Sequence, residues 1–291
     1  MTAMASNLTT RPLGPAFGIE IGGADLNRIT GAQMAEIVDC LDRASALLIR
    51  DQVLTPEALV AFSRRLGELD EAPVNEAGKT VVAGLPELYV VSNIEDADGV
   101  PIGSLGAGEA VWHTDMSYLS IPPDASLLYA VEIPPEGGDT WVAGMVAALE
   151  GMEPRLRARI EGRRIKHDGT YNSAGYLRQG LVATDDPLEA AGAFHPAICR
   201  QPRSGHEALY LGRRRNAWIE GLERAASEAL LDALWTHATR DEYCYKHRWR
   251  VGDVLIWDNR TTLHRRDPFD AAARRLMHRT QVRGKARPEG A

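Results

Sequence analysis

The sequence predicts a mainly β fold with a few flanking helices, arranged as a β-sandwich or jelly roll. Short runs of apolar and β-branched residues recur, glycines and prolines separate them, and few segments have apolar residues at helical spacing. The 291 residues are enough for a large buried core. Because no repeat, low-complexity stretch or linker divides them, we expect a single domain over residues 1–291.

In the first half of the chain, the clearest signals belong to two helices. Residues 1–12 predict a loose start. Apolar residues at helical spacing predict a helix over 31–48, and Thr55 followed by Pro56 has the N-cap and first-turn chemistry of a second helix. Strands are expected at 18–22, 88–92 and 126–133.

The second half should hold two further helical regions on either side of a long loop. A helix is expected over 145–161, restarted at Pro154, and an amphipathic helix over 222–239. Between them, residues 171–194 are rich in Gly, Ala and Asp with weak periodicity, which is typical of a functional loop or lid. Strands are expected at 248–250, 254–257 and 276–282.

Composition and charge exclude several classes of function. The net charge of −7 argues against a nucleic-acid surface, and the short basic runs at 213–215 and 265–266 are typical of solvated faces. No stretch reaches the roughly 18 apolar residues of a membrane span, and no secretion signal is recognisable. We therefore expect a cytoplasmic protein without nucleic-acid or membrane partners. Its cysteines are too scattered for a disulfide framework or a zinc site: Cys40, Cys199 and Cys244.

A His-x-Asp pair provides the first candidate ligands for a metal. On a strand, His113 and Asp115 point to the same face, so an imidazole and a carboxylate can bind one ion. His264 is the best candidate for the third ligand, and two histidines with one carboxylate form the facial triad of non-haem iron oxygenases. Spacing alone does not exclude a plain surface pair, nor the other histidines, at 167, 195, 206, 237, 247 and 278.

Two arginines further along the chain are candidates for an anion site. Arg275 and Arg279 are four residues apart, so a strand would place both on one face with Met277 between them. Arginine suits bidentate recognition of a carboxylate. Surface charge on an edge strand is the alternative interpretation.

Together these motifs resemble the taurine/2,4-dichlorophenoxyacetate dioxygenase family, a branch of the 2-oxoglutarate-dependent oxygenases. The resemblance covers about residues 12 to 284, and the motifs occur in family order. They are Trp112-His113-Thr114-Asp115, the run from Pro135 to Thr140, the run from Gly252 to Arg260 with His264, and Arg274-Arg275-Leu276-Met277-His278-Arg279.

The resemblance implies a double-stranded β-helix, the jelly-roll core of cupin-like proteins. It implies that Thr140 and Arg275 hold the distal carboxylate of 2-oxoglutarate, and that O₂ is the second co-substrate. The metal would be Fe(II), and its ligands would be His113, Asp115 and His264.

The substrate pocket departs from that of the taurine-oxidising members. By the family mapping, Arg279 binds an acid group of the substrate or lies near the co-substrate. Where taurine-oxidising members carry a histidine after the second helix, this sequence has Ala72, and where they carry an asparagine before the first metal histidine it has Glu109. Taurine is therefore not the expected substrate. Further candidates to line the pocket are Asn93, Tyr118, Glu109 and the 171–194 loop.

The expected function is an Fe(II)- and 2-oxoglutarate-dependent dioxygenase that hydroxylates a small anionic organic substrate and releases succinate and CO₂. Hydroxylation next to oxygen, nitrogen or sulfur would also cleave the substrate. Two alternatives remain open, a jelly-roll metal enzyme without O₂ chemistry, such as a hydrolase or isomerase, and a non-catalytic ligand-binding member. The resemblance also implies a homodimer or homotetramer.

Overall fold

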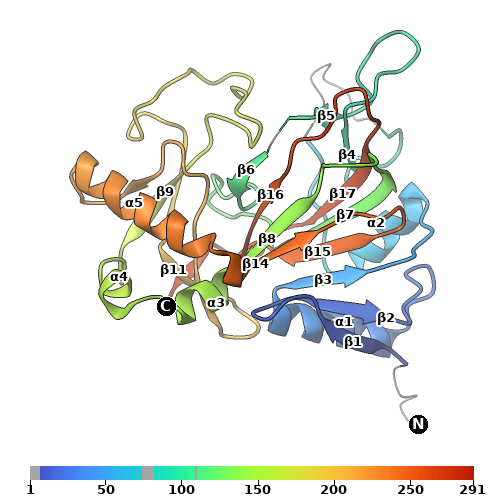
Figure 1. Ribbon diagram of the computed structural model, residues 1–291, viewed down its shortest axis with the longest axis horizontal. Coiled ribbons are helices and arrows are strands. Elements are labelled where there is room, and N and C mark those ends of the chain that lie inside the picture. The colour runs from blue at the N-terminus through green and yellow to red at the C-terminus, as the bar shows by residue number, and fades with distance from the viewer. Residues whose placement is uncertain (1–6, 74–81, 109) are drawn as a thin grey trace.

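The computed structural model describes residues 7–73, 82–108 and 110–291. Two β-sheets lie at its centre, and helices pack on their outer faces (Figure 1). The larger sheet has the strand order β1-β2-β3-β15-β7-β17-β4-β5, and the smaller one has the order β14-β8-β16-β6. This architecture agrees with the jelly-roll core expected from the sequence.

The strands have the following bounds. The larger sheet consists of β1 (Thr9–Pro12), β2 (Ile19–Gly22), β3 (Ala46–Ile49), β15 (Val254–Asp258), β7 (Ala125–Glu132), β17 (Leu276–Val282), β4 (Tyr89–Ser92) and β5 (Ser104–Leu105). The smaller sheet consists of β14 (Cys244–His247), β8 (Thr140–Gly144), β16 (Thr262–Arg266) and β6 (Ala110–His113). Two three-stranded sheets contain β10 (Gly192–Pro196), β9 (Arg164–Asp168) and β13 (Trp218–Ile219), and β12 (Glu207–Leu209), β11 (Ile198–Arg200) and β18 (Glu289–Gly290).

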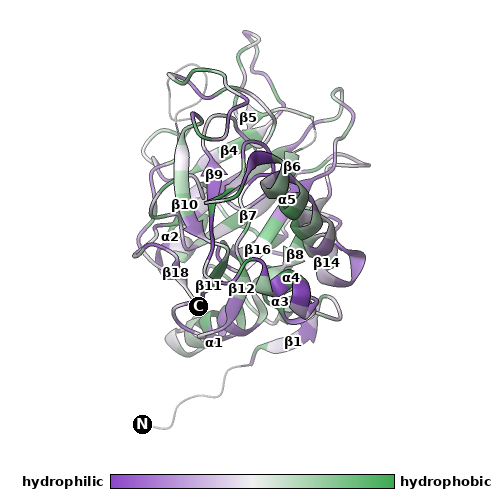
Figure 2. Ribbon diagram, turned by 90° about the vertical axis from the view of Figure 1, so that its left-hand side faces the viewer, coloured by the Kyte–Doolittle hydropathy of each residue, from purple (hydrophilic) through white to green (hydrophobic). Residues whose placement is uncertain are grey.

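The helices are amphipathic and use their apolar faces for packing. α5 shows this pattern, because Leu230 and Leu234 are buried while Asp232 stays exposed (Figure 2). None of the helices in the described ranges is long and apolar enough to cross a membrane. The helices are α1 (Gly31–Ala44), α2 (Pro56–Arg64), α3 (Met145–Glu150), α4 (Pro154–Ala158), α5 (Arg224–Ala238) and the 3₁₀ turn η1 (Asp241–Tyr243).

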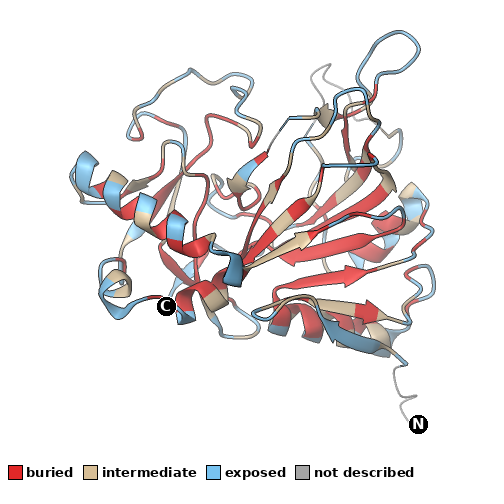
Figure 3. Cartoon of the chain, viewed as in Figure 1, coloured by how far each residue is buried: buried red, intermediate tan, exposed pale blue. Residues whose placement is uncertain are grey.

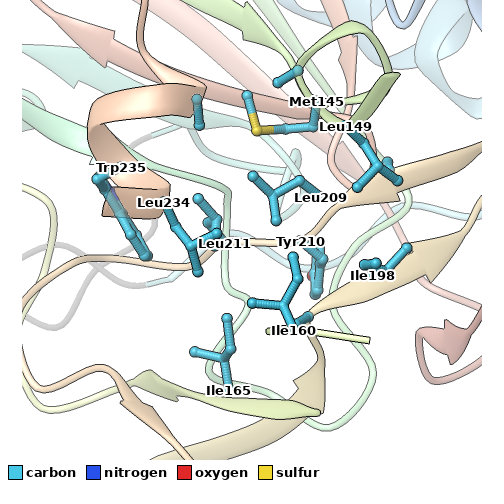
Figure 4. Close-up of a cluster of buried hydrophobic side chains, with 14 of the residues drawn as sticks. Met145, Leu149, Ile160, Ile165, Ile198, Leu209, Tyr210, Leu211, Leu234 and Trp235 are labelled. Carbon is cyan, nitrogen blue, oxygen red and sulfur yellow. The ribbon is translucent and has the colours of Figure 1, made fainter. Parts of the chain in front are cut away.

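Three clusters of buried side chains hold these layers together. One joins the larger sheet to α1 and α2, and the second fills the space between the two sheets around Trp257 and Met277. The third packs α3 and α5 on the outer face of the smaller sheet, with Met145 and Leu234 among its members (Figure 4). The central strands are accordingly buried, whereas the loops above them in this view are largely exposed (Figure 3).

Alternation along β16 and β17 decides which side chains face the space between the sheets. On β16, Leu263 packs outward into the α3–α5 cluster, so the neighbouring His264 points the other way. On β17, Met277 packs between the sheets, whereas Thr280 points outward and hydrogen-bonds Ser63 of α2 at 2.7 Å. β17 pairs with β7 on one side and with β4 on the other, so it lies in the interior of the larger sheet.

The first helix is shorter than the expected 31–48. It begins after Thr30, whose side chain forms a capping box with Gln33. It ends at Ala44, because Ser45 adopts a left-handed conformation with a φ of 64°. Residues 46–49 therefore leave the helix and form β3, whose four residues are all buried.

The other helix predictions are confirmed. α2 begins at Pro56 with Thr55 as its N-cap, and the 145–161 region forms α3 and α4 with a new start at Pro154. α5 spans most of the expected 222–239, and β17 spans the expected 276–282.

Two predictions about irregular and extended segments are wrong. Residues 9–12 are not loose but pair with β2 as β1, while residues 1–6 lie outside the described ranges. The strand expected at 248–250 occurs earlier, as β14. The backbone N–H of Arg250 instead donates to Asp253 Oδ2 at 2.9 Å, which fixes a turn at this point.

Candidate metal centre

Two histidines meet where β6 pairs with β16. His113 is the last residue of β6, and it lies directly opposite His264 in the antiparallel register. Their ring centroids are 4.1 Å apart, and both residues are buried. The pairing joins residues that are far apart in the sequence, so it selects His264 from the histidines that spacing left open.

Asp115 adds a carboxylate to the histidine pair. Its Oδ1 lies 3.8 Å from His113 Nε2 and 3.9 Å from His264 Nε2. The sequence suggested that Asp115 lies on the same strand as His113. β6 ends at His113, however, so Asp115 lies in the turn that follows the strand. Within residues 7–73, 82–108 and 110–291, this is the only group of three His, Cys, Asp or Glu side chains with metal-ligand spacing.

Neighbouring groups orient two of the three side chains. His113 Nδ1 lies 2.7 Å from the carbonyl oxygen of Val111, so Nδ1 donates its hydrogen and Nε2 keeps a free lone pair. Asp115 Oδ2 accepts a hydrogen bond from Ser126 Oγ at 2.7 Å. Asn259 Nδ2 in turn donates to Ser126 Oγ at 3.1 Å, which fixes the hydroxyl. The carboxylate is thus held with Oδ1 toward the histidines.

Burial and nearby charge set the protonation states that a metal requires. Burial lowers the pKa of His264 to about 4 and holds the pKa of His113 well below its usual value. Burial alone would raise the pKa of Asp115, but the charge of Arg279, the neighbouring histidine rings and the hydrogen bond from Ser126 outweigh it, so this pKa is lowered. At neutral pH the site therefore presents two neutral imidazoles and one carboxylate, a set that suits a divalent transition metal.

A cavity of about 850 Å³ opens beside these ligands. His113 and Asp115 line it, as does Arg279, whose Nη1 lies 3.2 Å from Asp115 Oδ1. Much of the remaining wall is aromatic or aliphatic, which suits the body of a small organic molecule. These residues are Tyr89, Leu105, Met116, Tyr118, Tyr176, Leu177 and Leu181.

Arg275 forms a second charged feature between the sheets. Its side chain is 2% exposed, and its Nε has no hydrogen-bond partner among the described residues. Burial and the charge of Arg266 lower the pKa of Arg275 to about 9. A buried guanidinium without an anionic partner is costly, so this position suits an incoming anion.

Thr140 and Gly138 belong to the same region of the smaller sheet. The Thr140 hydroxyl accepts a hydrogen bond from Trp249 Nε1 at 3.0 Å, which leaves its own hydrogen free to donate. Gly138 has a φ of +67°, and a Cβ at this position would lie 3.4 Å from Arg275 Nε. Glycine thus keeps space beside the guanidinium.

Comparison with known proteins agrees with this geometry. The family model described as "Taurine catabolism dioxygenase TauD, TfdA family" matches residues 9–281. The chain belongs to this family. It is therefore an α-ketoglutarate-dependent dioxygenase, and 2-oxoglutarate and O₂ are its co-substrates.

Several curated TauD/TfdA relatives cover almost the whole chain. The α-ketoglutarate-dependent 2,4-dichlorophenoxyacetate dioxygenase of Cupriavidus pinatubonensis is 32% identical over 94% of this chain and 96% of its own length. Pentalenolactone F synthase of Streptomyces arenae is 31% identical over 91% of each chain. An α-ketoglutarate-dependent sulfate ester dioxygenase of Pseudomonas putida is 31% identical over 89% of this chain and 84% of its own.

Solved structures of the TauD/TfdA type share the fold. A taurine dioxygenase from Burkholderia xenovorans superposes with a TM-score of 0.78 at 33% identity, covering 98% of this chain and 93% of that one. AAD-2 in complex with Mn(II) and N-oxalylglycine superposes with a TM-score of 0.79 at 27% identity, covering 98% and 100%. The expected jelly-roll fold is thereby confirmed.

The structure brings some of the remaining candidates of this TauD/TfdA enzyme to the cavity and not others. Tyr118 lines the cavity, and so does much of the 171–194 loop, which has no helix or strand until β10 begins at Gly192. Asn93 does not line it. Its Nδ2 donates to the carbonyl oxygens of Ala271 and Ala273, and its Oδ1 accepts from the backbone N–H of Arg275. Glu109 lies outside the described residues.

One cavity residue was missed because it was interpreted as part of a solvated basic run. Arg213 is only 5% exposed and lines the cavity beside the metal ligands. No periodic pattern precedes it, since it follows β12 in irregular backbone, so the sequence carried no signal of its burial. Ser126 was missed too, because its contact with Asp115 depends on the packing of β7 against the β6 turn.

Proposed function

We propose that the metal is Fe(II), that His113, Asp115 and His264 hold it, and that the enzyme hydroxylates a small anionic organic substrate. The donor set carries the metal assignment, because two neutral imidazoles with one carboxylate are typical of the iron sites of non-haem oxygenases. Bound iron would supply the coordination positions and the oxidising chemistry that convert 2-oxoglutarate, O₂ and substrate to succinate, CO₂ and hydroxylated product.

Arg275 and Thr140 are assigned to the distal carboxylate of 2-oxoglutarate. The unpartnered guanidinium and the hydroxyl hydrogen of Thr140 are both suited to an anion. Thr140 lies two residues before Val142, which pairs with His264, so about 7 Å along β8 separates the hydroxyl from the metal ligand. A five-carbon dicarboxylate is of comparable length. Arg279, beside Asp115, would contact the metal-proximal end of the co-substrate or the substrate.

The names of the relatives indicate an anionic substrate without selecting one. One relative is named for 2,4-dichlorophenoxyacetate and another for sulfate esters, both of which are anions. A Burkholderia structure is named for taurine, but Ala72 replaces the histidine of taurine-oxidising members and does not line the cavity. Taurine is therefore not the expected substrate, and an acid with an apolar body is preferred.

Anaerobic reconstitution tests the proposal. Fe(II) and 2-oxoglutarate together should give a visible charge-transfer band, and His113→Ala should abolish it, because the variant lacks a metal ligand. The exposed His206 supplies the matched control, since His206→Ala should keep the band. A band that persists in His113→Ala would refute the ligand assignment. Succinate release across aryloxyalkanoates, alkyl sulfates, sulfonates and amino acids would then identify the substrate.

The same preparation tests two broader parts of the proposal. We infer a homodimer or homotetramer from the family resemblance, and light scattering after size-exclusion chromatography distinguishes these from a monomer. A cytoplasmic location is supported by Cys40, Cys199 and Cys244, which are free thiols. Fractionation of the native host tests this location, and activity outside the cytoplasmic fraction would contradict it.

A further inference from the structure

Arg213 places a buried positive charge in the wall of the cavity. Its side chain is almost wholly buried, yet it lines the space beside His113 and Asp115. Its Nε has no hydrogen-bond partner, and across the described ranges no carboxylate forms an ion pair with the guanidinium. Burying an unpaired charge is costly, so Arg213 lowers the stability of the protein unless an anion binds beside it.

Arg213 differs from the next two residues, because both of those arginines form ion pairs with carboxylates. Arg214 pairs with Glu228 and Asp232 on α5, and Arg215 pairs with Asp185. Both therefore have the ordinary surface role that a basic run suggests, whereas Arg213 turns inward and has no ion-pair partner in the part of the chain that the structure describes.

Asp115 and Asp168 are the carboxylates that interact electrostatically with Arg213, and both already have other hydrogen-bond partners. Asp115 pairs with Arg279 at 3.2 Å and accepts from Ser126. Asp168 accepts from the backbone N–H groups of the next turn, at Thr170 and Tyr171. Burial and the charge of Arg178 together lower the pKa of Arg213 to about 10, so these carboxylates do not offset its desolvation.

Arg178 brings a second guanidinium to the same wall. It belongs to the 171–194 loop, lines the cavity, and lies over the ring of Tyr118 at 4.3 Å. Its Nε is also buried without a hydrogen-bond partner among the residues described. Two guanidinium groups that repel each other, and that form no ion pair within residues 7–73, 82–108 and 110–291, make a site that an anion would stabilise.

We propose that Arg213, together with Arg178, binds the anionic head of the primary substrate, a carboxylate or a sulfate ester with an apolar body. The apolar body would lie against Tyr118, Met116 and Leu177, which line the same cavity. This inference rests on the proposed function, and it assigns the acid group of the substrate to Arg213 instead of Arg279, whose charge is matched by Asp115. Arg275 remains the anchor of the co-substrate.

Binding of matched acids and neutral analogues tests the assignment. The protein is loaded anaerobically with Fe(II) and saturating 2-oxoglutarate, and dissociation constants are measured by calorimetry for phenoxyacetate against phenoxyacetamide and for hexyl sulfate against hexanol. Wild type, Arg213→Gln, Arg213→Lys and Arg178→Gln are compared. Arg214→Gln is the matched control, because Arg214 is adjacent in sequence but pairs with α5 outside the cavity.

We expect wild type to bind at least one acid more tightly than its neutral analogue. Arg213→Gln should weaken the binding of that acid by about 10- to 100-fold, the range for a charged hydrogen bond, and leave the affinity for the neutral analogue unchanged. Arg213→Lys should recover part of the lost affinity for the acid. Arg178→Gln should lose less affinity than Arg213→Gln, and Arg214→Gln should bind the acid as tightly as wild type does.

Three results would overturn the proposal. The first is that wild type prefers no acid in the panel over its neutral analogue. The second is that Arg213→Gln keeps wild-type affinity for the preferred acid. The third is that Arg213→Gln weakens 2-oxoglutarate binding, measured from the charge-transfer band, which would place Arg213 in the co-substrate site. Loss of the band in wild type would instead refute the proposed function, so the two failures are distinguishable.

Discussion

Replacing Arg275 with methionine should separate co-substrate binding from metal binding. Methionine has a similar length but no charge, so the distal carboxylate of 2-oxoglutarate would be buried without a partner. Arg275 is 2% exposed, and breaking a buried ion pair of this kind costs about 3–5 kcal/mol. That cost corresponds to a loss of about 10²- to 10³·⁵-fold in 2-oxoglutarate affinity.

Titration of the anaerobic Fe(II) protein with 2-oxoglutarate measures this loss. The adjacent Arg274 provides the control, because it is exposed and pairs with Glu132 on the surface at 2.8 Å. Arg274→Met should therefore keep wild-type affinity. Fe(II) binding, followed by equilibrium dialysis, should be unchanged in both variants.

The unfolding of the ligand-free variant provides a second measurement. Wild-type Arg275 is a buried charge whose Nε lacks a partner among the described residues, so its removal should not destabilise the protein without 2-oxoglutarate. Unchanged 2-oxoglutarate affinity in Arg275→Met would refute the anchor assignment and transfer it to another cation. A large loss of stability in the ligand-free variant would indicate that Arg275 has a structural role instead.

Three further perturbations test the metal centre and its surroundings. The metal-free protein should lose stability as the pH falls from about 6.5 to 4, because the folded pKa of His264, about 4, lies below its unfolded value and the unfolded state binds more protons. Urea unfolding at pH 7 and pH 4 should show a loss of up to about 3 kcal/mol from this group, and His264→Gln should reduce the dependence. Asp115→Ala should abolish succinate release and Fe(II) retention, and full turnover would contradict its role as a ligand. Trp249→Phe removes the hydrogen bond to Thr140, so the KM for 2-oxoglutarate should rise about 3- to 10-fold with little change in kcat, and an unchanged KM would show that this orientation is unimportant.

Local signals in the sequence were sufficient to predict several elements and part of the site. Thr55 and Pro56 mark the start of α2 by chemistry that acts within one turn. The alternation of β17 predicts its span, and it places Met277 and Arg279 on one face because side-chain direction repeats every two residues. His113 and Asp115 were recognisable as a pair for the same reason, even though the strand ends between them.

Features that depend on distant partners were not predictable in this way. The choice of His264 required the family resemblance, because only the β6–β16 pairing brings it to His113. The end of α1 depends on Ser45 in a left-handed conformation, which a serine seldom signals. Arg213 was assigned to the surface and Asn93 to the pocket, since loop burial and backbone hydrogen bonds arise from tertiary packing alone.

The interior place of β17 has a consequence for the order in which the protein is assembled. β17 is the last strand of the larger sheet in the sequence, but in the sheet it lies between β7 and β4. The ribosome therefore completes both of these neighbours, and the other strands of that sheet, before it makes β17. Until then β7 and β4 each present an unpaired edge, which is a hazard for aggregation during synthesis. Arg279 lies on β17, and Arg275 immediately precedes it. The step that closes the sheet therefore also delivers the proposed co-substrate anchor, so a partly made chain would lack the guanidinium that we assign to 2-oxoglutarate.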